Sequence, residues 1–186
     1  MESSWEEKPL GELVSYIARG IAPKYTDTRN GNSIIVLGQR CIRNKTIDYN
    51  QARLHDLAAK SCKEEKFVKP LDILINATGV GSAGRVAQVF SQEPHCITDS
   101  HVLTLRGNGT IDPIYLGYSV KLKQPQIEGL AEGSTGQTEM NKQRLLSEVV
   151  IPYPKSREIQ RYISEFGRSI DKKIEINNRL NDYLAA

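Results

Sequence analysis

Hydrophobic positions along the chain follow two spacings, one typical of strands and one typical of helices. Apolar, β-branched runs between turn residues predict strands in SIIVLG, DILIN, RVAQVF and CITDSHVLTLR. In PLGELVSYIARG, apolar residues recur at helical spacing from Leu10 to Ile17, and Gly20 is a plausible stop, so a helix is predicted there. Two short helices are predicted in PIYLGYSVKL and PQIEGLAEG, a loop in EGSTGQT, and a helix leading into a strand in NKQRLLSEVVIPYP. Strands and helices do not alternate regularly, so the pattern predicts an α+β fold with a mixed, strand-rich core.

The C-terminal segment carries the clearest pattern in the chain. It predicts a helix from about residue 156 to 184, which would be about 43 Å long at ~1.5 Å rise per residue. Ser156 is the expected N-cap, and Glu158 in the first turn suits the helix dipole. Gly167 weakens the helix interior and marks a point where the helix could bend. One heptad frame places the following residues at a and d positions, with Ile174 alongside: Ile159, Ile163, Phe166, Ile170, Leu180 and Leu184.

Such a helix is longer than a domain of this size needs, so much of its apolar stripe would stay uncovered within one chain. Lys173 and Asn177 interrupt the stripe, and a lone polar residue at an a position can fix the register and number of paired helices. We therefore expect the stripe, together with Asn177, to form a coiled-coil dimer. The alternative is a terminal helix packed on its own domain. Prolines at 152 and 154 mark the boundary between a globular part, residues 1–154, and the helix, residues 155–186.

Composition narrows the class of protein without fixing its function. The 186 residues allow one compact domain with an appendage, and no apolar run approaches the ~20 residues that span a bilayer. The polar start, MESSWEEKPL, is not expected to be a secretory signal. Cys41, Cys62 and Cys96 form no C-x-x-C pair, which suits reduced thiols in a cytoplasmic protein. The net charge of +3 does not by itself indicate a nucleic-acid ligand, although basic residues could gather on one face.

A glycine motif raises the question of nucleotide binding. Gly79, Gly81 and Gly84 give G-x-G-x-x-G after a predicted strand, and Asp99 follows twenty residues later. The third glycine of a dinucleotide site belongs to a helix, but RVAQVF and the breakers that follow leave no room for one. The motif therefore predicts a glycine-rich turn between strands.

Other groupings suggest catalysis or metal binding only superficially. His95, Cys96, Asp99 and His101 lie close in sequence but give no tetrahedral ligand set. The serines at 82, 100 and 134 lack a nucleophile elbow, and no activated nucleophile or acid/base pair is recognisable. We expect no metal, no cofactor and no enzymatic activity.

Several segments together resemble the specificity (S) subunits of type I restriction–modification systems. The resemblance begins at Trp5 and LGELVSYIARG and continues through IIVLGQRCIRNKTID and KPLDILINATGVGSAGRV. It is strongest from GSTGQTEMNKQRLLSEVVIPYP through the long helix, where D-x-K-I-E-x-N follows E-I-Q. Family members usually have E-E-Q or E-Q where this chain has Glu158-Ile159-Gln160. Full subunits contain two recognition domains and two long helices, so this chain resembles a half subunit, natural or cut from a longer chain.

The resemblance implies a non-catalytic chain that reads DNA sequence. Its implied partners are double-stranded DNA, the modification (methyltransferase) subunits, the restriction subunit and a second copy of itself. A homodimer of half subunits would read a bipartite site with matching, inverted ends. Loop residues with donors and acceptors are the candidate DNA contacts: Lys24, Tyr25, Arg43, Asn44, Lys45, Arg85, Gln137, Asn141 and Lys142. Two alternatives stay open, a coiled-coil interaction adaptor that does not bind DNA and a cofactor enzyme built around the Gly79–Gly84 loop.

Overall fold

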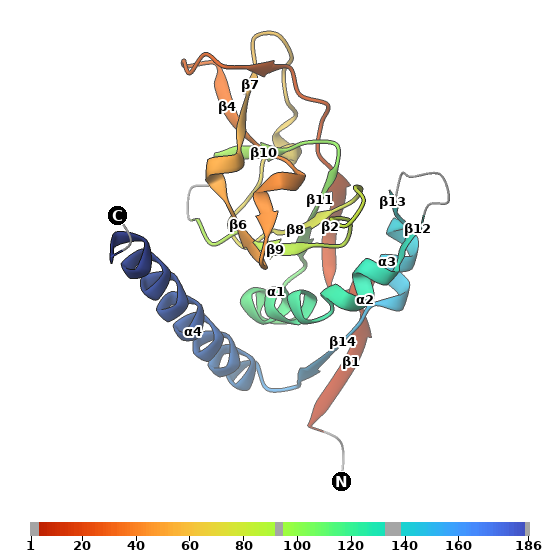
Figure 1. Cartoon of the computed structure of the whole chain (residues 1–186). Coiled ribbons are helices and arrows are strands. Elements are labelled where there is room, and N and C mark those ends of the chain that lie inside the picture. The colour runs from red at the N-terminus through yellow and green to blue at the C-terminus, as the bar shows by residue number, and fades with distance from the viewer. Residues whose placement is uncertain (1–3, 92–94, 133–138, 185–186) are drawn as a thin grey trace.

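The structure is a computed structural model that describes residues 4–91, 95–132 and 139–184 (Figure 1). Two four-stranded sheets form its centre. The first is antiparallel, in the order β2 (Val14–Arg19), β11 (Val102–Gly107), β8 (Ile73–Asn76) and β9 (Val86–Gln88). The second has the order β10 (Cys96–Thr98), β4 (Ser33–Leu37), β7 (Arg53–Asp56) and β3 (Tyr25–Thr26), and its β10 and β4 are parallel.

Shorter elements surround these sheets. Three two-stranded ribbons pair β1 (Trp5–Pro9) with β14 (Val150–Pro154), β5 (Ile42–Arg43) with β6 (Thr46–Ile47), and β12 (Ala131–Glu132) with β13 (Glu139–Met140). The α-helices are α1 (Pro113–Leu122), α2 (Gln124–Gly129), α3 (Lys142–Glu148) and α4 (Arg157–Leu184). Single 3-10 turns occur at η1 (Leu10–Glu12), η2 (Gln39–Cys41), η3 (Tyr49–Gln51) and η4 (Glu64–Lys66). The predicted mixed, strand-rich domain followed by a long helix is confirmed.

The main core lies between the first sheet and the helices. One cluster is formed by buried apolar side chains of β8, β11, β14, α1 and α3. A second cluster lies between the two sheets. Every predicted strand segment contains a strand, and CITDSHVLTLR forms two, β10 and β11. The two short predicted helices are α1 and α2. The predicted EGSTGQT loop falls largely outside the described residues. No described helix combines the length and the apolar character that a bilayer crossing requires.

The prediction of a helix in PLGELVSYIARG is wrong. Only Leu10–Glu12 turns, as the 3-10 element η1, and Val14–Arg19 is strand β2. Leu10 and Leu13 are still buried in the core, so their spacing did reflect burial. β2 pairs along its length with β11, which is about ninety residues away in sequence. This long-range pairing overrides a local spacing that fits a helix equally well.

The long helix begins as predicted and passes close to α1. Ser156 Oγ accepts a hydrogen bond from Ile159 N, as expected of an N-cap. Gly167 does not interrupt α4, which is continuous from Arg157 to Leu184. A Cβ at this position would lie 3.0 Å from the ring of Tyr118 on α1. The glycine therefore allows close approach of the two helices.

Candidate nucleic-acid interface

A tight hairpin presents the first group of candidate residues. The β5–β6 ribbon turns through Asn44 and Lys45, whose φ angles are 50° and 61°. Two successive residues with positive φ are typical of the type I′ turn, in which asparagine is favoured. Arg43, Asn44 and Lys45 are exposed as a result. The hairpin thus projects two cationic side chains and an amide from a rigid backbone.

The glycine motif forms a turn that supports a third cation. Gly79, Gly81 and Gly84 all have positive φ and lie between the antiparallel strands β8 and β9. Strand β9 follows the motif directly, so the prediction of a glycine-rich turn between strands is confirmed. Arg85 closes the turn, because its Nη2 donates to the carbonyl of Gly81 at 2.8 Å.

These two turns meet at a surface hollow of about 530 Å³. Arg43, Asn44, Lys45 and Arg85 line it together with Gln124. Four of the nine residues predicted as DNA contacts are thereby brought together from segments forty residues apart. No carboxylate lines this hollow among the described residues. It offers three cationic groups and two amides, which suit phosphate and base-edge contacts.

A second hollow, of about 320 Å³, lies beside η2. Tyr25, another predicted contact, lines it, and the guanidinium of Arg53 lies 3.4 Å from the centre of the Tyr25 ring. Sequence reasoning missed the other polar residues at this hollow: Gln39, Arg40, Gln51, Arg53, Asp99 and His101. The sequence analysis considered Asp99 and His101 as metal ligands, and Asp99 also as the acidic residue of a dinucleotide motif, but no local signal placed them beside η2.

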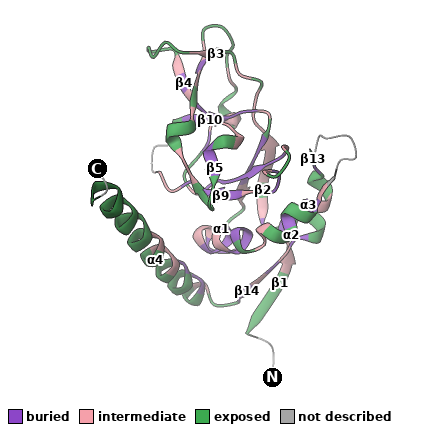
Figure 2. Ribbon diagram, in the orientation of Figure 1, coloured by how far each residue is buried: buried purple, intermediate pink, exposed green. Residues whose placement is uncertain are grey.

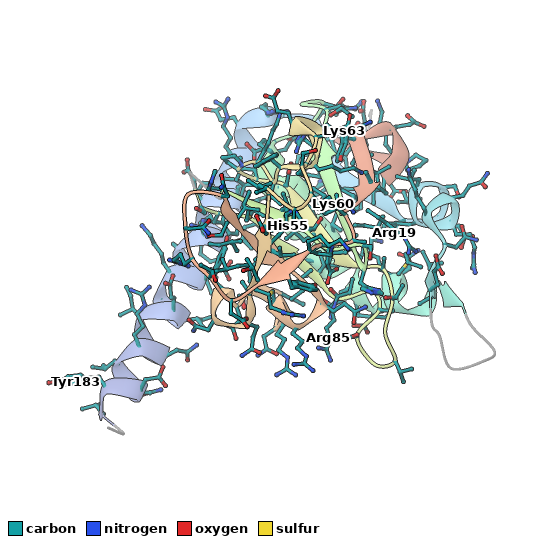
Figure 3. All side chains as sticks on the ribbon, turned by 90° about the horizontal axis from the view of Figure 1, so that it is seen from above. Arg19, His55, Lys60, Lys63, Arg85 and Tyr183 are labelled. Atoms are coloured by element: carbon teal, nitrogen blue, oxygen red, sulfur yellow. The ribbon has the colours of Figure 1, made fainter. Side chains whose placement is uncertain are left out.

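The cationic side chains that line the two hollows are here named the basic face, and they are Arg40, Arg43, Lys45, Arg53 and Arg85. Gln39 of η2 lines the second hollow and hydrogen-bonds Thr78, which precedes the glycine turn. Figure 3 shows nitrogen-tipped side chains gathered along the edge of the molecule where Arg85 lies, whereas Lys63 lies at the opposite edge. The modest net charge of the chain is therefore unevenly distributed.

The remaining predicted contacts lie elsewhere or are already engaged. Asn141 is the N-cap of α3, where its side chain accepts from the N–H groups of residues 143 and 144. Lys142 Nζ donates to the carbonyl of Ile17 at 3.0 Å. Lys24 is exposed next to Tyr25, and its backbone N–H donates to His55 Nδ1. Gln137 lies outside the described residues. The structure thus groups Tyr25, Arg43, Asn44, Lys45 and Arg85 but not Asn141 or Lys142.

Groups that could support catalysis are few. Within residues 4–91, 95–132 and 139–184, no cluster of three or more His, Cys, Asp or Glu side chains could hold a metal ion. Cys41 and Cys96 are buried free thiols, and burial raises the pKa of Cys96 to about 12. A thiol with so high a pKa supplies no thiolate nucleophile near neutral pH.

The contact between α4 and the globular part is polar rather than apolar. Gln160, only 2% exposed, accepts from Asp112 N at 2.7 Å and donates to the carbonyl of Pro154 at 2.8 Å. Ser164, equally buried, donates to Asp112 Oδ1 at 2.9 Å. Further along, Asp171 accepts from the hydroxyl of Tyr118 at 2.6 Å. The side chains that make these contacts, those of Gln160, Ser164, Asp171, Asp112 and Tyr118, are here named the polar seam.

The apolar stripe of α4 lies about a quarter turn around the helix from the polar seam and remains largely exposed (Figure 2). Its exposed fractions range from 37% at Ile163 to 72% at Leu184, and Asn177 is exposed as well. The stripe comprises Ile159, Ile163, Phe166, Ile170, Ile174, Leu180 and Leu184. Contact with the domain therefore leaves an extended apolar surface on the helix.

Comparison with known proteins identifies the family. A family model described as the type I restriction modification DNA specificity domain matches residues 2–186. Similar solved structures include the type I restriction–modification S subunit from M. genitalium, with 15% identity and a TM-score of 0.66, over 92% of this chain and 40% of that one. The HsdS subunit from Thermoanaerobacter tengcongensis has 17% identity and a TM-score of 0.63, over 96% and 40% of the two chains.

A third similar structure is titled for complex assembly and conformational transition of the type I R-M system. Its identity is 20% and its TM-score 0.68, over 96% of this chain and 41% of that chain. This chain therefore spans about 40% of the length of these structural relatives. No curated protein sequence matches it. The resemblance inferred from the sequence motifs is confirmed: the chain belongs to the family of type I restriction modification DNA specificity domains.

Proposed function

We propose that this chain is a non-catalytic, sequence-reading half of a type I specificity subunit. Residues 1–154 would read DNA, and residues 155–186 would pair two copies of the chain. The assembled pair would direct modification and restriction subunits to a bipartite site in the cytoplasm. The chain itself would need no cofactor, because cleavage and methyl transfer would belong to the other subunits.

The basic face is the observation that supports DNA binding most directly. Five cations line the two hollows, together with the side-chain amides of Asn44, Gln124, Gln39 and Gln51. Cations neutralise phosphates and fix the position of a protein on the duplex, whereas amides hydrogen-bond to base edges. An adaptor that does not bind DNA would have no use for this arrangement, so the basic face favours the DNA-reading function over the adaptor function.

The uncovered stripe on α4 supports self-association. Two copies of the stripe can cover each other about a two-fold axis, which is the commonest symmetry of homo-oligomers. A two-fold dimer presents two identical basic faces, and two-fold protein symmetry is mirrored in the DNA site. We therefore expect a site with inverted, matching ends separated by a spacer.

Lys45→Gln is expected to weaken binding to all DNA sequences alike. Removing one phosphate contact should also make the plot of log affinity against log salt shallower by about one unit. Lys63→Gln is the matched control, because it removes the same charge from the opposite edge (Figure 3). Fluorescence anisotropy with duplex DNA over a salt series measures both the affinity and its salt dependence. Equal slopes for the two variants would contradict the assignment of the basic face as the DNA surface.

The proposed assembly is tested by purifying the chain with modification subunits and mapping the methylated sites. The expected map shows one bipartite sequence with symmetric ends. Unrelated left and right ends would refute the symmetric pair, and failure to direct any methylation would refute the function.

Asn177→Leu is expected to stabilise the dimer while reducing its preference for one helix orientation or number. A buried amide penalises alternative pairings, and leucine removes that penalty together with its cost in stability. Thermal melting measures the stability of the dimer, and light scattering measures the number of chains in the assembly. A lower melting temperature with unchanged association would show that Asn177 lies outside the seam of the coiled coil.

A further inference from the structure

The second hollow contains a carboxylate in an otherwise basic setting. Strands β4 and β10 run parallel, so the residues that follow them, Gly38 and Asp99, meet at the same edge of the sheet. Both line the hollow. A Cβ placed on Gly38 would lie 2.7 Å from Asp99 Oδ2. The missing side chain of Gly38 therefore leaves this oxygen accessible from the hollow.

Only one oxygen of Asp99 is satisfied within the described part of the chain. The residue is 7% exposed, and its Oδ1 accepts from the backbone N–H of His101 at 2.8 Å. No donor among the described residues hydrogen-bonds Oδ2. This oxygen is accessible from the hollow, so it can accept a hydrogen bond from a ligand that enters the hollow.

A series of hydrogen-bonded side chains places a donor, His101, in the same hollow as Asp99 Oδ2. Gln39 Nε2 donates to Thr78 Oγ1 at 2.5 Å, and Thr78 Oγ1 lies 2.8 Å from His101 Nδ1. The Thr78 hydroxyl has its own proton to donate, so we assign Nδ1 as the acceptor and place the proton of the neutral imidazole on Nε2. His101 is exposed and lines the hollow. The hollow therefore contains both an acceptor and a donor.

This combination discriminates among bases in the major groove. Adenine and cytosine present an exocyclic amino group there, whereas guanine and thymine present the O6 and O4 acceptors. A carboxylate oxygen accepts from an amino group and repels a carbonyl oxygen. We propose that Asp99 Oδ2 selects an amino-bearing base, adenine or cytosine, at one position in each half of the site. This inference rests on the proposed function. If the base is adenine, His101 Nε2 donates to its N7.

The inference is tested by mapping the sites methylated by the complex of the full chain with its modification subunits. Asp99→Asn supplies an amide donor that can face O6 or O4, so guanine or thymine should become tolerated at one position per half-site. Discrimination there should fall about 5- to 150-fold, with the other positions unchanged. His101→Ala distinguishes the two bases, because it should weaken discrimination at an adenine and leave a cytosine position unaffected.

A stability measurement separates reading from folding. Burial raises the pKa of Asp99 above its ordinary value, and the hydrogen bond from the backbone N–H of His101 partly opposes this shift. The folded chain then holds the proton more tightly than the unfolded chain, so stability falls as pH rises through the raised pKa. Asp99→Asn removes this penalty and retains an acceptor for His101 N–H. It should therefore melt at the same temperature as the wild type or higher at neutral pH, with a smaller gain in acid.

Gly38→Ala tests the same oxygen without changing Asp99. Its φ of −103° and ψ of −177° suit any residue, and its methyl group would lie 2.7 Å from Oδ2, so it must cover or displace that oxygen. It should reduce the same discrimination as Asp99→Asn. Unchanged maps for folded Asp99→Asn and Gly38→Ala would overturn the inference while the Lys45→Gln salt effect still upheld DNA binding. A wild-type complex without sequence preference would overturn both the inference and the proposed function.

Discussion

Replacing Ile163 and Ile170 together by aspartate is expected to convert the proposed dimer into a monomer. Both residues lie on the exposed apolar stripe of α4, and their substitution leaves the polar seam intact. In a two-fold dimer each change occurs twice, so four carboxylates would lose water in the interface. Burying an unpaired carboxylate costs several kcal/mol, so the dissociation constant should rise at least about a thousandfold. Sedimentation equilibrium at micromolar concentration measures the change.

Lys172→Asp provides the control for this experiment. It lies two residues after Ile170, about 200° around a helix of 3.6 residues per turn, and it is exposed. We expect this variant to remain a dimer, although its change in charge per chain equals that of the double variant. A wild-type chain that sediments as a monomer at the same concentration would refute self-association through α4.

Gln160→Leu is expected to lower the free energy of unfolding by about 2–5 kcal/mol, because it leaves two buried backbone groups without partners. Asp112 N would lose its acceptor, and the carbonyl of Pro154 would lose its donor. Chemical denaturation followed by circular dichroism measures the loss. The same change should loosen the angle between α4 and the globular part, which a distance measurement between labels on the two parts would detect.

The neighbouring exposed residue supplies the matched variant for this substitution. Arg161→Leu introduces the same side chain on the solvent side of α4 and should change stability by no more than about 0.5 kcal/mol. Gln160→Glu keeps an acceptor for Asp112 N but buries a carboxylate against the carbonyl oxygen of Pro154, so its loss should be at least as large as that of Gln160→Leu. Equal stabilities for Gln160→Leu and Arg161→Leu would show that the polar seam does not hold the helix.

Local patterns predicted most elements of this fold because burial and spacing agree within them. The strand around Ile34–Leu37, the helix from Pro113 and the whole of α4 are of this kind. The helix prediction for residues 10–19 failed because their apolar spacing fits both a helix and a partly buried strand. The partner that decides between these, β11, is distant in sequence. The polar docking of α4 was also not predictable, because Gln160 and Ser164 resemble ordinary surface residues.

Some residues of the candidate site could also be predicted from the sequence, whereas others could not. Arg43, Asn44 and Lys45 could be proposed because polar residues at a turn are visible in the sequence, and the fold brings Arg85 beside them. Asp99 could not be connected with Gly38, since that contact requires the parallel pairing of β4 with β10, sixty residues apart. The charge of the whole chain was equally uninformative, because it averages the basic face with acidic residues elsewhere.

The pairing of β1 with β14 has a consequence for synthesis on the ribosome. β1 is made about 140 residues before its partner strand, since Trp5 pairs with Pro154 and Lys155 N donates to Ser4 O at 2.9 Å. The two four-stranded sheets contain only residues up to Gly107, so they can form while this ribbon is still open. Contacts of such high sequence separation form slowly. The start of α4 is therefore fixed only after both sheets have had time to fold on the ribosome.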